Sequence, residues 1–156
     1  MSEIVEKAEK YVSALLTEKL DPRFLYHNLR HTQDVVKSTK ELLNFHPLGA
    51  AEKEQLLLAA WFHDVGYTQG WDNHEQHSCS MAQAFLSEHG HPPGDTARVC
   101  ELIMATRMEH TPKDQMEAII KDADLSHFVH RTYWDTTDML REELKNFGLA
   151  DYSDRQ

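Results

Sequence analysis

The feature that most constrains the fold is an apolar segment that ends abruptly in two polar residues. Seven consecutive residues, Leu56 to Phe62, are apolar, and His63 and Asp64 follow them directly before Gly66. A helix that is apolar on all sides is normally packed by neighbours in every direction. Burying a polar group there costs about 2–7 kcal/mol, and more for a charge, unless hydrogen bonds or a metal ion compensate. The rest of the chain is therefore expected to supply partners for this pair.

Helical periodicity covers most of the remaining sequence, and nothing reads as a convincing strand. The length of 156 residues suits one domain with one core. We therefore expect an all-α helical bundle of six or seven helices, with residues 1–156 as a single domain. The expected helices span residues 3–20, about 27–45, 50–66, 74–88, 96–107, 112–128 and about 133–147.

Local signals set several of these boundaries. Asn73, with Gln76 three residues later, has the spacing of a capping box. Thr111 is expected to cap the sixth helix, because Pro112 follows it at the first helical position and Asp114 lies in the first turn. Residues 66–70 and 92–94 are expected to be loops.

The charge and the cysteine content exclude several classes of protein. The formal net charge is -10, whereas a protein that tracks nucleic-acid phosphates needs clustered Lys and Arg. Cys79 and Cys100 form neither a disulfide framework nor a CxxC pair, which favours a reducing compartment. No apolar run approaches the roughly 18 residues of a membrane span, and the N-terminus does not resemble a signal peptide. We expect a cytoplasmic protein; a homodimer is left open.

Several polar residues lie on or beside apolar helical faces. Around the apolar run these are the His63-Asp64 pair and, from other segments, His31, His74, His110 and Asp124. A single such histidine is more often a hydrogen-bonded core residue, but several imidazoles and carboxylates together suit a metal site. Mixed N and O ligands favour Mn, Fe, Co, Ni or Zn, and a carboxylate-rich site tolerates Mg. Periodicity does not decide between Asp122 and Asp124.

The order of these residues resembles the HD superfamily of metal-dependent phosphohydrolases, named for its His-Asp doublet. The resemblance is closest to a group of small bacterial proteins described only as predicted HD phosphohydrolases, and it covers about residues 26–130. The segments that carry it are YHNLRH (26–31), LAAWFHDVGY (58–67), HEQHSCSMA (74–82), LIMATRMEH (102–110) and KDADLSHF (121–128).

The resemblance implies a metal site formed by His31, His63, Asp64 and Asp124, because the family places this last ligand in an Ala-Asp-Leu context. Asp122 would then be a neighbouring structural acid. In two-metal relatives the HD aspartate, here Asp64, bridges the two ions.

The extra histidines of those relatives correspond in order to His74 and His110. In single-metal members such histidines serve substrate phosphate or proton transfer, so one or two ions per chain stay open. Glu75 is a candidate base or a first-turn acid favoured by the helix dipole. Arg30 and Arg107 are candidates for holding phosphate oxygens.

The function expected from this resemblance is hydrolysis of a phosphoester on a nucleotide or another small phosphorylated metabolite by metal-activated water. His63, Asp64, His74, Glu75 and His110 are the candidate catalytic residues. Two alternatives stay open. One is a di-iron oxygenase of the same fold, and the other is a non-catalytic metal-binding or signalling module.

Overall fold

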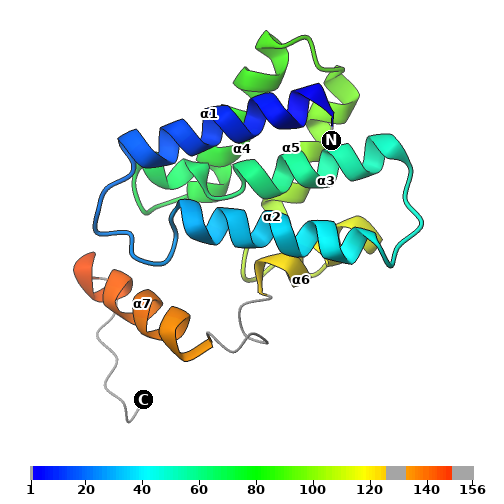
Figure 1. Cartoon of the computed structure of the whole chain (residues 1–156). Coiled ribbons are helices and arrows are strands. Elements are labelled where there is room, and N and C mark those ends of the chain that lie inside the picture. Colours follow the sequence, from blue (N-terminus) through cyan, green and yellow to red (C-terminus); the bar gives the residue numbers. More distant parts are fainter. Residues whose placement is uncertain (1, 126–132, 149–156) are drawn as a thin grey trace.

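The computed structural model describes residues 2–125 and 133–148, without the side chains of residues 133–137. This part of the chain contains seven α-helices and one 3-10 helix, and no strand (Figure 1). The all-α prediction is therefore confirmed. The elements are α1 (Glu3–Lys19), α2 (Leu29–Leu43), α3 (Ala50–Phe62), the 3-10 helix η1 (Val65–Gln69), α4 (His74–Glu88), α5 (Pro93–Met104), α6 (Gln115–Asp124) and α7 (Tyr133–Asn146).

Helix α3 lies at the centre of the bundle and contacts α1, α2, α4, α5 and α6. Its residues Leu56, Leu58 and Phe62 are fully buried, as the apolar run predicts. His63 follows as the C-cap residue and is itself fully buried. The helix therefore delivers the His-Asp pair into the interior, at the end where η1 begins.

Helix α2 is shorter than expected at its start. Asn28 is the N-cap, and its side-chain oxygen accepts hydrogen bonds from the backbone N–H groups of Arg30 and His31. His27 therefore precedes the helix, whereas the expected helix starts at about residue 27. The extended backbone of the capping asparagine ends the helical repeat there.

Three other local predictions are wrong. The helix expected over residues 50–66 ends at Phe62, and Val65–Gln69 form the 3-10 helix η1 where a loop was expected from residue 66. Asn73 has a left-handed backbone (φ 56°) and makes no side-chain cap, so the expected capping box is absent. Helix α5 begins inside the expected loop, at Pro93, because proline is well suited to the first helical turn, and it ends at Met104, before the expected Arg107.

Helix α6 begins later than predicted, because Asp114 and not Thr111 caps it. The Asp114 carboxylate accepts a hydrogen bond from the backbone N–H of Glu117 at 3.0 Å. The helix ends at Asp124, and the rest of its expected extent to Phe128 falls largely outside the described residues.

A close contact between η1 and α4 fixes the backbone just after the His-Asp pair. The Gly66 N–H donates to the Ser78 hydroxyl oxygen at 2.8 Å, and that hydroxyl donates to the His63 carbonyl oxygen at 2.9 Å. A Cβ atom on Gly66 would lie 2.0 Å from the His74 carbonyl oxygen. Only glycine therefore fits at this position without displacing the backbone.

Helix α7 stands apart from the other helices in Figure 1 and is held by a buried carboxylate. The side chain of Glu143 is fully buried and accepts hydrogen bonds from the backbone N–H groups of Tyr26 and His27 at 2.9 and 2.8 Å. Its second oxygen pairs with the His27 ring. Helix α7 is thus attached to the segment that leads into α2.

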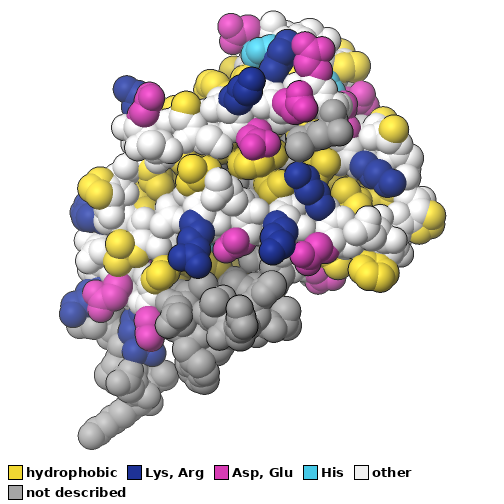
Figure 2. Space-filling model, in the orientation of Figure 1, with side chains coloured by type: hydrophobic (Ala, Val, Ile, Leu, Met, Phe, Trp, Pro, Cys, Tyr) yellow, Lys and Arg dark blue, Asp and Glu magenta, His cyan; other side chains and the backbone are white. Residues whose placement is uncertain are grey.

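Among the described helices, none is long and apolar enough to cross a membrane. On the face that Figure 2 shows, Lys and Arg side chains are interspersed with acidic ones.

Candidate metal centre

Four side chains, from α2, from α6 and from the two residues that follow α3, converge beside the C-terminus of α3. His31 lies in the first turn of α2, His63 caps α3, Asp64 follows it, and Asp124 is the last residue of α6. His31, His63 and Asp64 are buried, and the Asp124 side chain is 22% exposed. The site is therefore an interior cluster of donor atoms, and Asp124 is its most exposed member.

The distances between these donors suit a single ion. Nε2 of His31 lies 3.1 Å from Asp124 Oδ1 and 3.3 Å from Asp64 Oδ2. Nε2 of His63 lies 3.4 and 3.2 Å from the same two atoms. Ligands bound at about 2.1 Å stand roughly 3.0 Å apart at right angles and about 3.4 Å apart at tetrahedral angles. One ligand atom each from His31, His63 and Asp124 lies within 4.8 Å of the others, so the three form a group able to hold a metal ion.

Two atoms of this group are buried without a hydrogen-bond partner among the described residues. They are Nε2 of His63 and Oδ2 of Asp64, which face each other at 3.2 Å. Nδ1 of His63 lies 2.7 Å from the Ala60 carbonyl oxygen, which requires a ring proton on Nδ1, so Nε2 is the ring atom that faces the carboxylates and could bind an ion. Orphaned buried polar atoms are costly, and a cation between them would satisfy both.

The electrostatics of the site also favour a positive charge at its centre. Burial opposes ionisation of His63, but the carboxylates of Asp64 and Asp124 outweigh it and raise the pKa of His63 well above its usual value. Burial likewise opposes ionisation of the two acids, yet the neighbouring imidazoles hold the pKa of Asp64 and of Asp124 low. The carboxylates thus remain charged and available as ligands.

The structure decides between the two acids that the sequence left open. Asp124 contacts both His31 and His63, whereas Asp122 is exposed on α6. Asp124 is therefore the residue placed to act as the ligand.

His74 and Glu75 extend the cluster on the other side of Asp64. Nε2 of His74 lies 3.3 Å from Asp64 Oδ1 and 3.4 Å from Glu75 Oε2. Asp64 therefore turns one oxygen towards His31 and His63 and the other towards His74. The Tyr67 ring stacks on His74 with the ring centroids 3.9 Å apart, which fixes the imidazole plane.

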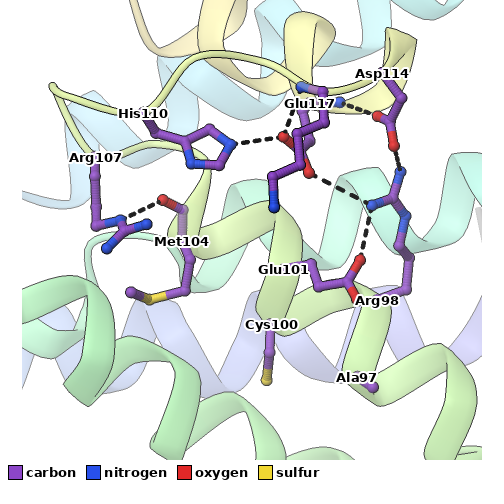
Figure 3. Close-up of a pocket in the computed structure, with 10 residues that line it drawn as sticks. Ala97, Arg98, Cys100, Glu101, Met104, Arg107, His110, Asp114 and Glu117 are labelled. Atoms are coloured by element: carbon purple, nitrogen blue, oxygen red, sulfur yellow. Dashed lines mark hydrogen bonds and ion pairs between the residues drawn. The ribbon is translucent and has the colours of Figure 1, made fainter.

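The structure does not bring His110 into this cluster. Its Nε2 lies 2.6 Å from Oε1 of Glu117, in a pocket between α5 and the start of α6 (Figure 3). Arg107 lines the same pocket, and its Nε donates to the Met104 carbonyl oxygen at 3.0 Å. Arg30 is exposed in the first turn of α2, beside His31 in sequence. Of these three, only Arg30 lies on the helix end that contributes a side chain, His31, to the cluster.

Sequence reasoning missed Glu143, which stabilises the chain segment just before His31. Burial disfavours the charged imidazole of His27, but the hydrogen bond that His27 donates to Glu143, together with the nearby carboxylate charges, outweighs it and raises the pKa of His27. A signal was present, because Glu143 shares helical spacing with Leu140, Leu144 and Phe147. An acidic residue on an otherwise apolar stripe of a helix indicates a buried carboxylate with a specific partner.

The chain matches no protein-family model, no curated protein and no solved structure. Its function is therefore inferred from the geometry of the metal centre.

Proposed function

We propose that this chain is a metal-dependent phosphohydrolase of the HD type, acting on a nucleotide or another small phosphorylated metabolite. The observation that carries the proposal is the pair of orphaned, buried donor atoms, His63 Nε2 and Asp64 Oδ2, flanked by His31 and Asp124 at ligand spacing. Two imidazoles with two carboxylates suit Mn, Fe, Co, Ni or Zn, and tolerate Mg.

The residues have distinct roles in this proposal. His31, His63, Asp64 and Asp124 would hold the ion. The ion would polarise the phosphoryl group and lower the pKa of water towards about 7.

Proton handling falls to His74 and Glu75. Nε2 of His74 lies within 3.4 Å of both Asp64 and Glu75, so the imidazole can pass a proton between the site and the partly exposed Glu75 carboxylate. Arg30, exposed at the start of α2, is the candidate for holding a phosphate oxygen.

The contacts of His110 favour hydrolysis over the di-iron alternative. A two-iron centre of this type would need His110 as a ligand, and its Nε2 is instead paired with Glu117. Support for a second ion comes from Asp64 Oδ1 and Nε2 of His74, which lie 3.3 Å apart and could bind it together.

The experiment that tests the proposal is elemental analysis of the full chain, purified without added metal or chelator. The parent is compared with His63→Ala, Asp64→Ala and Asp124→Ala, and with Asp122→Ala as the matched control. We expect stoichiometric metal in the parent and in Asp122→Ala, a loss in the other three, and manganese-dependent release of phosphate from nucleotides or p-nitrophenyl phosphate that follows the metal content.

Other outcomes would redirect the proposal. Full metal content and full activity in the three ligand variants would overturn it. Two irons per chain with substrate-dependent oxygen consumption would assign the oxygenase instead. A chain that takes up none of manganese, iron, nickel or magnesium would point to a binding module.

A further inference from the structure

The two cysteines of the chain, 21 positions apart in sequence, meet across the contact between α4 and α5. The Cys79 thiol donates to the Cys100 carbonyl oxygen at 3.4 Å, and the Cys100 thiol donates to the Cys79 carbonyl oxygen at 3.6 Å. Both residues are partly buried. Each sulfur thus lies against the backbone of the other residue, on two helices that pack closely together.

The environments of the two thiols differ. Contact between them lowers the pKa of Cys100 and raises that of Cys79, which burial raises further. Cys100 also lines the pocket between α5 and the start of α6, which has a volume of about 440 Å³ and includes Arg98 and Arg107. Figure 3 shows the Cys100 sulfur directed away from the ionic side chains of this pocket. Contact with Cys79, and not the cations of the pocket, therefore makes Cys100 the thiol that ionises more readily.

We propose that Cys79 and Cys100 form a peroxide-sensitive dithiol, which closes to an intramolecular disulfide between α4 and α5. The oxidant is hydrogen peroxide or a small hydroperoxide. The reciprocal contacts of the two thiols carry the proposal, because a disulfide forms only where the two backbones already approach closely.

The chemistry proceeds in two balanced steps. The Cys100 thiolate attacks one oxygen of hydrogen peroxide, the O–O bond breaks, and hydroxide leaves, so that Cys100 becomes a sulfenic acid. The Cys79 sulfur then attacks the Cys100 sulfur, the S–O bond breaks, and water leaves once protonated. Overall, two thiols lose two hydrogen atoms and one peroxide becomes two waters. A thiol reductant restores the pair by exchange.

The proposal does not depend on the metal centre. The test therefore uses the reduced full chain in buffer with a chelator, so that no bound metal consumes peroxide. Hydrogen peroxide is added at a small molar excess, and free thiols, intact mass and non-reducing electrophoresis are followed over time. We expect loss of both thiols with a mass decrease of two hydrogen atoms, a monomeric band, a Cys79–Cys100 cross-linked peptide after proteolysis, and full reversal by dithiothreitol.

Variants separate the two roles. Cys79→Ser should keep a comparable first oxidation rate and accumulate a sulfenic acid that dimedone traps. Cys100→Ser leaves Cys79 without its partner thiol and should likewise form no intramolecular disulfide.

The matched control is the double variant Cys79→Ser, Ser80→Cys. It keeps two thiols per chain but moves one to an exposed position on α4, and it should lose the intramolecular bond. Circular dichroism checks that each variant is folded. The proposal is overturned if the parent forms only intermolecular disulfides, if its thiols survive peroxide that oxidises glutathione, or if the double variant closes as readily.

Discussion

The candidate metal centre and the ionic cluster of the α5–α6 pocket contain similar residues but differ in how their polar atoms are partnered. In the ionic cluster, formed by Arg98, Glu101, His110, Asp114 and Glu117, each carboxylate has a cation as partner. Arg98 lies 2.6, 2.9 and 3.8 Å from Asp114, Glu101 and Glu117, and His110 lies 2.6 Å from Glu117. In the candidate metal centre, by contrast, Nε2 of His63 and Oδ2 of Asp64 are buried and have no hydrogen-bond partner among the described residues.

The difference separates a structural cluster from a binding site. Paired charges need nothing further, so the ionic cluster is expected to stabilise the start of α6 and to be indifferent to metal. Buried polar atoms without hydrogen bonds raise the free energy of the folded state, and a bound ion at ligand distance would lower it. Histidine and carboxylate content alone, as read from sequence, does not distinguish the two.

The largest effect is expected from a change that breaks the metal centre without touching a ligand. Gly66→Ala places a methyl group 2.0 Å from the His74 carbonyl oxygen, so the chain should lose about 3 kcal/mol of stability or more, and its metal content. Denaturant unfolding and elemental analysis measure the two losses. Gly94→Ala is the control, because nothing lies within 4 Å of its Cβ, and it should gain roughly 0.4–1 kcal/mol. Equal stability of the two variants would contradict the tight contact between η1 and α4.

The next largest effect is expected from adding metal, which should stabilise the folded chain. Manganese at a hundred times its Kd should stabilise the folded chain by about 2.7 kcal/mol, or roughly 5–10 °C in Tm. Asp124→Ala should lose this shift, and Glu117→Gln should keep it. Thermal unfolding with and without manganese gives the answer, and an equal shift in both variants would mean that the ion binds elsewhere.

Breaking the ionic cluster should have a smaller effect, confined to stability. Glu117→Gln removes the charge from a buried carboxylate that accepts hydrogen bonds from His110 and the Lys113 N–H, at a cost of roughly 1.5 kcal/mol. Glu101→Gln, at an exposed partner of the same arginine, should cost less than about 0.5 kcal/mol. Denaturant unfolding compares them, while metal content should equal that of the parent in both. Loss of metal in Glu117→Gln would contradict this prediction and mean that the ionic cluster affects metal binding.

The smallest expected effect is a pH dependence of the ionic cluster. Burial opposes ionisation of Glu117, but its bonds to His110 and the Lys113 N–H prevail and hold its pKa below the usual 4.5. The unfolded chain therefore binds this proton more readily, so the stabilisation is complete above pH 4.5 and is lost as pH falls through the lowered pKa. Unfolding midpoints of the parent and of Glu117→Gln should converge on acidification; a constant difference would contradict the assignment.

The sequence predicts the central helix and most of the metal centre because both depend on burial. The apolar run before His63 identified α3, and helical spacing placed His31 and Asp124 near the core. It did not choose between Asp122 and Asp124, since both have apolar neighbours in sequence and only the packing of α6 against α2 exposes one of them.

The helix starts were less predictable, because competing caps lie a few residues apart. Thr111 and Asp114 are both good capping residues, and the structure uses the aspartate that Arg98 also pairs with. The position of His110 depends in turn on its contact with Glu117, in the first turn of α6. Such contacts between loop and helix leave no periodic signal in the sequence.

The attachment of α7 by Glu143 has a consequence for biosynthesis. The carboxylate binds backbone groups 117 and 116 positions earlier in the chain. At about 5–20 residues per second, a ribosome needs roughly 6–23 s to cover that distance. During this interval the nascent segment around His27 lacks its buried partner. The bundle up to α6 can therefore begin to assemble well before the segment that leads into His31 is held by its hydrogen bonds to Glu143.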